Sequence, residues 1–246
     1  MSKFRLKLAK NAGEKKAKES GVTSFPVDVR AIVIGEDINL VEKPPAQKGV
    51  SGGIIFHSQS EEVTIFHASN IISEGFRNFT IGHELGHYFL PGHPEEIISS
   101  SPIHLSRAGF SQGASSIEIE ADHFSAGLLM PSRLVRKTLN EGQVGLDDVL
   151  NLAERSKCSL TASAIRTAEC AEYPMAIIVS HKDFISYGFM SESFKSLKPT
   201  YPRKGDSLPY TGTREFNQDV DNVFKSKRYV TRANSLNGLG QRQMFF

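Results

Sequence analysis

The run His83-Glu84-Leu85-Gly86-His87 constrains the fold of this chain more than any other feature. Residues four apart on an α-helix lie on one face, so His83 and His87 can both reach one metal ion if a helix carries them. Apolar residues on both sides of the run predict that this helix is buried. Burial makes unpartnered imidazoles and carboxylates costly, and a shared metal ion would satisfy two of the three groups. We therefore favour a metal site over an ordinary buried helix.

The residue types in this run point to zinc and to a general base. Imidazole nitrogens are common zinc ligands, and two of them on one rigid turn are preorganised for the ion. Glu84 lies on the flank of the ligand face, near enough to a water molecule in the site to take its proton. Gly86 costs the helix about 1 kcal/mol relative to Ala, which predicts close approach of another backbone segment. The spacing is typical of a metallopeptidase.

The third metal ligand has two candidates, because a catalytic zinc ion takes three protein ligands and leaves one position to water. Glu118 and Asp122 share one helix face, so Glu118 could bind the ion while Asp122 orients a ligand histidine. His93 is the rival, because it stands at the spacing of the third histidine in the metzincin pattern. We favour Glu118, since Pro91-Gly92 ends the first helix before His93.

Hydrophobic periodicity and turn residues predict an α+β chain. Helices are expected over residues 4–20, 27–34, 74–90 and 116–130, with two or three more across 132–171. Strands are expected over residues 38–41, 52–56, 63–66, 175–180 and 184–189. The strands at 52–56 and 63–66 should pair as a hairpin directly before the histidine helix, and an extended substrate should add to the edge of their sheet.

Two motifs together resemble a known family. The first is Phe-Thr-Ile-Gly-His-Glu-Leu-Gly-His-Tyr at residues 79–88, and the second is Glu-x-x-Ala-Asp-x-Phe-x-Ala-x-Leu-Leu-Met-Pro at residues 118–131. They resemble the ImmA/IrrE family of bacterial and phage metallopeptidases over about residues 25–171. The resemblance implies a compact thermolysin-like zincin fold, with His83 and His87 as zinc ligands, Glu84 as the catalytic glutamate and Glu118 as the third ligand. It also implies a helix-turn-helix repressor as the substrate, cut to relieve repression.

The chain divides into three expected parts. Residues 1–131 should form a zincin-like catalytic core with a small sheet and the active-site helices. Residues 132–172 should form a helical subdomain packed on the core, and residues 173–246 a small C-terminal α/β unit. Apolar spacing within 152–165 has the rhythm of a helix-turn-helix, but the nearly balanced charge there favours a packed subdomain.

Composition narrows the partners and the compartment. A net charge of +2 is ordinary for a globular protein, so direct nucleic-acid binding is not expected. The two cysteines, Cys158 and Cys170, support neither a disulfide framework nor a cysteine-rich metal site, which fits the cytoplasm. No apolar stretch approaches the roughly 20 residues that span a bilayer. Neither secretion nor membrane insertion is expected.

Other functions and several roles stay open in the sequence. The chain could be a non-catalytic regulatory module on a zincin fold, or one half of a toxin-antitoxin pair. Glu84 argues against a purely structural zinc site, which has no use for a flanking base. The donor that stabilises the reaction's oxyanion could be Tyr88, His104 or His123. Glu120 and His123 are expected at the surface or behind the ligands rather than on the metal.

Overall fold

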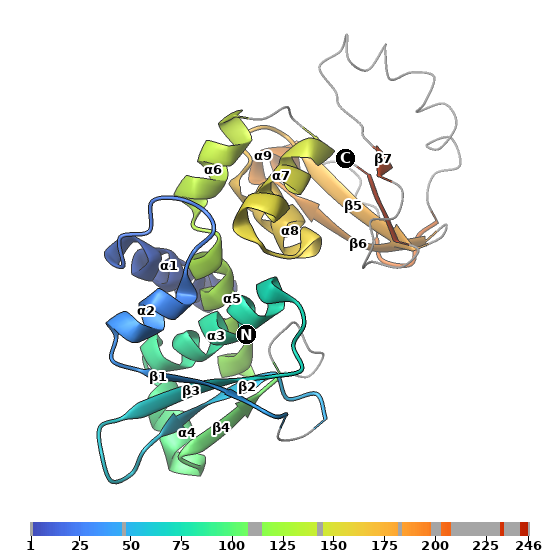
Figure 1. Cartoon of the computed structure of the whole chain (residues 1–246). Coiled ribbons are helices and arrows are strands. Elements are labelled where there is room, and N and C mark those ends of the chain that lie inside the picture. The colour runs from blue at the N-terminus through green and yellow to red at the C-terminus, as the bar shows by residue number, and fades with distance from the viewer. Residues whose placement is uncertain are drawn as a thin grey trace, which may run out of the picture. The chain divides into compact units, whose positions relative to one another are not determined.

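The computed structural model describes residues 2–45, 48–107, 115–141, 145–181, 184–197, 203–207, 232–233 and 242–245. It confirms the predicted α+β class (Figure 1). The chain forms two compact units, one of Met1–Leu134 with Arg155–Ser159 and one of Val135–Glu154 with Leu160–Phe246. The division at residues 131 and 172 stays a prediction, and most of the chain beyond residue 197 lies outside the described residues. Among the described helices, none combines the length and apolar character that crossing a bilayer requires.

The first unit contains a four-stranded sheet in the order β1-β3-β2-β4. Its strands are β1 (Asn39–Lys43), β2 (Gly52–Phe56), β3 (Val63–Ala68) and β4 (Ile103–Ser106). The predicted hairpin is confirmed, because β2 pairs antiparallel with β3. β1 runs parallel to β3, and β4 pairs antiparallel with β2. The hairpin strands are therefore internal, and the edges of the sheet are β1 and β4.

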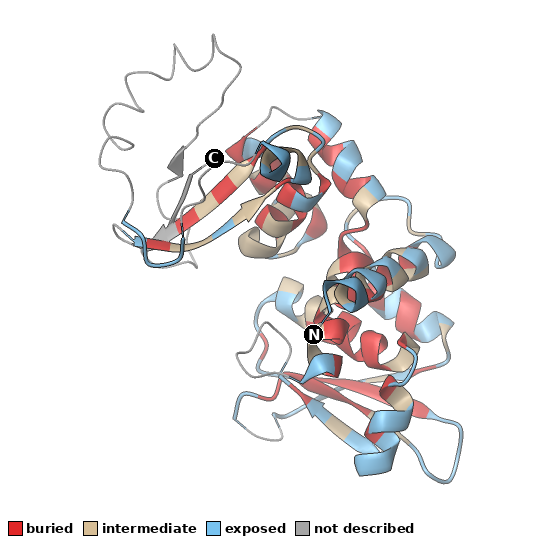
Figure 2. Cartoon of the chain, turned by 180° about the vertical axis from the view of Figure 1, so that it is seen from behind, coloured by how far each residue is buried: buried red, intermediate tan, exposed pale blue. Residues whose placement is uncertain are grey.

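The described part of the first unit also contains five helices: α1 (Lys3–Glu19), α2 (Val29–Gly35), α3 (Glu74–Phe89), α4 (His93–Ser100) and α5 (Ser116–Leu129). α3 packs on β2 and β3, and α5 packs on α3 and α1. The Ser73 hydroxyl begins α3 by accepting a hydrogen bond from the Phe76 N–H at 3.3 Å. The helix ends at Phe89, and Gly92, with φ +87°, turns the chain into α4. Buried residues gather on α3 and the central strands, whereas α1 keeps an exposed outer face (Figure 2).

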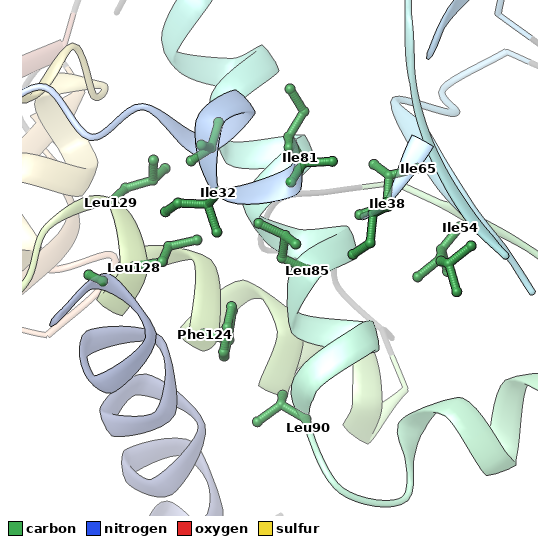
Figure 3. Close-up of a cluster of buried hydrophobic side chains, with 14 of the residues drawn as sticks. Ile32, Ile38, Ile54, Ile65, Ile81, Leu85, Leu90, Phe124, Leu128 and Leu129 are labelled. Atoms are coloured by element: carbon green, nitrogen blue, oxygen red, sulfur yellow. The ribbon is translucent and has the colours of Figure 1, made fainter. Parts of the chain in front are cut away.

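The hydrophobic core lies on both sides of α3. Figure 3 shows Ile81 and Leu85 of α3 between side chains of the sheet region and side chains of α5. The residues on the sheet side are Ile38, Ile54 and Ile65, and those of α5 are Phe124, Leu128 and Leu129. Both faces of α3 are thus covered, so the polar groups of the metal motif are buried as the sequence predicts.

Glycines bring three helices unusually close together. A Cβ atom at Gly86 of α3 would lie 3.0 Å from the Ala121 Cα of α5, which confirms the close approach predicted there. A Cβ at Gly82 would lie 2.6 Å from the Ser125 hydroxyl, one turn along the same interface. Between α1 and α5, a Cβ at Gly13 would lie 2.1 Å from a backbone carbonyl oxygen. At Gly86 and Gly13 the nearest atoms are backbone, so a side chain there requires the helices to move apart.

The second unit combines helices with a second sheet. Its elements are α6 (Ser132–Glu141), α7 (Leu146–Ser156), α8 (Leu160–Cys170), β5 (Ala176–His181), β6 (Phe184–Met190), α9 (Glu192–Ser196), β7 (Arg232–Ala233) and β8 (Arg242–Phe245), with α6 and α7 each crossing a unit boundary. The strand order is β6-β5-β8-β7, and the helices and strands predicted over 132–189 are confirmed. Asp148 is buried in this unit, where the Tyr173 hydroxyl donates to it at 3.3 Å. Burial raises the pKa of Asp148 to about 6.

Candidate metal centre

Three side chains from two helices converge on one point. α3 supplies His83 and His87 one turn apart, and the first turn of α5 supplies Glu118. The two Nε2 atoms are 3.1 Å apart. Glu118 Oε1 lies 3.0 Å from Nε2 of His87, and Oε2 lies 3.4 Å from Nε2 of His83. One ligand atom from each residue falls within 4.8 Å of the others, so the group could hold one metal ion.

The electrostatics of this group favour a positive charge at its centre. Burial alone would lower the pKa of His83, but its hydrogen bonds to Asp122 and Glu118 raise that pKa to about 10. Burial lowers the pKa of the neighbouring His87 to about 3, so this ring stays neutral. Burial would raise the pKa of Glu118, yet hydrogen bonds from three histidines hold it well below its usual range. Two imidazoles and an ionised carboxylate that attract a positive charge fit a divalent cation.

Asp122 holds the far side of the His83 ring. Its Oδ1 lies 2.8 Å from Nδ1 of His83, and both side chains are buried. Because Nδ1 faces this carboxylate, the Nε2 atom of His83 is left toward Glu118. This contact fits the predicted role of Asp122 in orienting a ligand histidine, and the role stays a prediction. Carboxylates in this position make the imidazole a stronger ligand.

Glu84 is fully buried beside the cluster. The Ser106 hydroxyl of β4 donates to its Oε2 at 3.2 Å, while Oε1 has no hydrogen-bond partner among the described residues. Burial raises the pKa of Glu84 to about 7 against the opposing charges of the nearby histidines. A Cβ at Gly52 would lie 3.4 Å from Oε1 and 2.5 Å from the Thr80 methyl group, so glycine keeps the space beside this carboxylate open.

Of the three residues considered as oxyanion donors, His104 lies beside the cluster. Its Nε2 is 2.8 Å from Glu118 Oε1, and its side chain is 23% exposed. Tyr88 instead packs into the hydrophobic core against Phe89. His123 is half-buried on α5. His104 sits on β4, a strand that the periodicity did not predict, so spacing alone gave no reason to choose it.

His93, the rival third ligand, lies behind His87 rather than inside the cluster. It begins α4 and is buried, with its Nδ1 3.3 Å from Nδ1 of His87. The atom of His87 that faces Glu118 is Nε2, so His93 contacts the opposite side of that ring. Glu120 is buried next to His93, with Oε2 3.5 Å from its Nε2. The roles of the site residues stay predictions, with Glu118 better placed than His93.

Comparisons with known proteins give a family and a similar fold. The profile of the IrrE N-terminal-like domain (Peptidase_M78) matches residues 37–167. A solved structure of a Mycobacterium tuberculosis transcriptional regulator is similar to 96% of this chain and 74% of its own, with a TM-score of 0.52 and 16% identity. At that identity the likeness shows the fold alone. A search of curated proteins gave no match.

The matched family region covers more than half of the chain and includes both helices of the metal cluster. It contains the paired histidines and Glu84 of α3 together with Glu118 and Asp122 of α5. The chain therefore belongs to the IrrE N-terminal-like domain family, whose members are metallopeptidases.

Proposed function

We propose that this chain is a zinc-dependent endopeptidase that cuts a helix-turn-helix transcriptional repressor at one or a few positions and so relieves repression. Family membership supports a metallopeptidase, and the cluster supports a site for one ion. Zinc is the proposed metal, held by His83, His87 and Glu118, because two imidazoles and a carboxylate are a common catalytic zinc set. Bound zinc would polarise the peptide carbonyl and make water nucleophilic at neutral pH.

The observation that carries the proposal is the buried carboxylate of Glu84 beside the cluster. Its Oε1 has no hydrogen-bond partner among the described residues, so it can accept the proton of an attacking water. Its Oε2 is held by the Ser106 hydroxyl, which fixes the carboxylate while it carries that proton. A pKa of about 7 suits a general base that must later return the proton to the leaving amine.

The edge strand β4 offers a place for the substrate backbone. β4 pairs with β2 on one side, and no described strand pairs with its other side. His104 and Ser106 stand two residues apart on β4 and so share one face of the strand. His104 contacts Glu118, and Ser106 contacts Glu84. A peptide paired with β4 would therefore pass the site. Main-chain pairing gives affinity without sequence choice. Selection of one bond must therefore come from side-chain pockets or from docking elsewhere.

We propose that His104 donates a hydrogen bond to the carbonyl oxygen of the scissile bond. It is the partly exposed histidine next to Glu118, on the strand that would pair with the substrate. Its Nε2–H is a donor that can turn from Glu118 toward a developing negative charge. Donors of this kind are worth about 10²- to 10³-fold in rate.

The repressor substrate rests on the family resemblance, and the proposed cytoplasmic location rests on the two cysteines, which support no disulfide framework. The first step of the test is to ask whether a small helix-turn-helix protein is encoded beside this chain, and the second is to incubate that protein with the zinc-loaded chain. Wild type should release a few discrete fragments, and zinc-loaded Glu84→Gln should be slower by about 10²- to 10⁴-fold. Near-full activity of that variant would refute the role of Glu84 as the general base. Rapid digestion of casein to small peptides would refute specific cleavage, and binding without any cleavage would favour a regulatory module.

A further inference from the structure

A second buried histidine stands directly behind one proposed metal ligand. His93 is 1% exposed, and its Nδ1 lies 3.3 Å from Nδ1 of His87. His83, the other histidine of the cluster, has a carboxylate in the same position, the one supplied by Asp122. The two ligand rings are thus supported in different ways. Nδ1 of His87 faces the imidazole of His93, whereas Nδ1 of His83 faces the carboxylate of Asp122.

The contacts continue from His93 to the surface of the unit. His93 Nε2 lies 3.5 Å from Oε2 of Glu120, whose side chain is 8% exposed. The same Oε2 accepts a hydrogen bond from Nη2 of Arg5 at 3.1 Å, and Arg5 Nε lies 2.9 Å from Oε1. The Arg5 side chain belongs to α1 and is 54% exposed. A continuous line of polar groups therefore joins α1 to the metal cluster.

The donors and acceptors along this line have one consistent arrangement. His87 must keep Nε2 free of a proton to bind a metal ion, so its proton lies on Nδ1. That N–H can donate only if Nδ1 of His93 is an acceptor, which places the proton of His93 on Nε2. Nε2 of His93 then faces the Glu120 carboxylate at 3.5 Å, and Arg5 pairs with the same carboxylate. Each group fixes the tautomer of the next.

We propose that Arg5, Glu120 and His93 position the ring of His87 and thereby set the metal affinity of the cluster, so that α1 is a functional part of the site. The inference rests on the proposed metal site but not on catalysis. Partners of this kind orient a ligand ring and raise its basicity. His87, His93 and Glu120 are all buried, and placing polar groups in the interior is costly unless other polar groups face them, as they do along this line.

The experiment compares zinc affinities by competition with a chromophoric chelator. His93→Ala should bind zinc about 10- to 100-fold more weakly than wild type. His93→Gln should recover most of that loss, because its amide oxygen can accept from His87 and its amide nitrogen can donate to Glu120. Arg5→Ala should weaken binding about threefold or more, a smaller effect because Glu120 and His93 both lie between Arg5 and the ligand.

Two control variants match these changes. Lys7→Ala removes an exposed positive charge from the same helix and should leave zinc affinity unchanged. His67→Ala removes an equally buried imidazole that contacts Arg30 of α2, and it measures the cost of the lost packing through thermal unfolding of the zinc-free chain. If His93→Ala loses stability as His67→Ala does but binds zinc normally, His93 only packs and the proposal is overturned, while the proposed function stands.

Two other results would also decide the matter. An Arg5→Ala affinity equal to that of Lys7→Ala would remove α1 from the site and overturn that part of the inference. A wild-type chain that binds no zinc would refute the proposed metal site, and the positioning role would fail with it. Zinc affinity should therefore fall in His93→Ala, recover in His93→Gln and take an intermediate value in Arg5→Ala. This full pattern is expected only if Arg5, Glu120 and His93 position the ring of His87.

Discussion

The substitution Gly86→Ala tests whether the distance between α3 and α5 sets the metal site. The new Cβ would lie 3.0 Å from the Ala121 Cα and 3.2 Å from both the Ala121 Cβ and its carbonyl oxygen. Carbon atoms in contact prefer about 3.5–4.0 Å. The two helices must therefore separate by about 0.5 Å, because the atoms they meet are backbone or attached directly to it.

Two effects on the free energy of unfolding oppose each other in this variant. Alanine is favoured over glycine in a helix interior by about 1 kcal/mol. Overpacking of a close interface usually costs about 1–3 kcal/mol. The net loss of stability is therefore expected to be about 0–2 kcal/mol, and most of the protein should remain folded.

Zinc affinity should suffer more than stability in Gly86→Ala. His87 follows the substituted residue, and Glu118 stands one turn before Ala121 on the facing helix. Ligand atoms must stay within about 0.5 Å of their productive positions, so the same separation should weaken zinc binding about tenfold or more, as disturbed ligand surroundings commonly do. Chelator competition measures the affinity, and urea unfolding of the zinc-free chain measures the stability.

Gly35→Ala is the matched control, because Gly35 ends α2 and a Cβ there would meet nothing within 4 Å. It should leave zinc affinity unchanged and stability equal or slightly higher. If Gly86→Ala binds zinc as tightly as Gly35→Ala, the close approach of α3 and α5 does not control the ligand positions, and the reasoning fails.

Other substitutions probe single contacts. Glu118→Ala should abolish measurable zinc binding in the competition assay, whereas Asp122→Ala should weaken it about 10- to 100-fold. His104→Ala should keep zinc but lower kcat about 10²- to 10³-fold, and an unchanged kcat would remove its assigned role. Gly127→Ala should lower stability in thermal unfolding by about 1–3 kcal/mol, since its Cβ would meet a carbonyl oxygen of α1 at 2.1 Å. The folded-state pKa of Asp148, about 6, lies above its unfolded value, so its stabilising contribution should be full below about pH 4 and lost as the pH rises through 6; urea unfolding of Asp148→Asn should lack this pH dependence.

Local sequence signals predict the elements that carry the metal motif. The helix expected over 74–90 is Glu74–Phe89, and the one expected over 116–130 is Ser116–Leu129. Both have a side chain or a proline that marks an end, and both have apolar residues that repeat at helical spacing. The hairpin is equally local, because its strands are joined by a short polar loop. These signals depend only on residues close together in the sequence, so the helices and the hairpin can be predicted without knowledge of the fold.

The surroundings of the ligands could not be predicted in the same way. β4 is four residues long and half exposed, so its period gives almost no signal, yet it places His104 and Ser106 at the site. Counting from His87 made His93 a rival ligand, but spacing cannot say which ring nitrogen it will face. Helix geometry correctly predicts that Glu120 points away from the face of the helix that carries Glu118. The face of α5 that carries Glu120 is buried because α1 packs against it. The contact between Arg5 and Glu120 joins residues more than 100 positions apart in the sequence.

Close helix packing and metal binding depend on each other in this fold. Helices with ordinary side chains at their interface pack with axes about 8–10 Å apart. Glycines on α1, α3 and α5 remove the side chains that would enforce this spacing. Carboxylates of α5 can then reach the histidines of α3, and Arg5 of α1 can reach the opposite face of α5. A larger residue at one of these glycines would move a ligand or its support, so the glycines of the interface belong to the metal centre as much as the polar residues do.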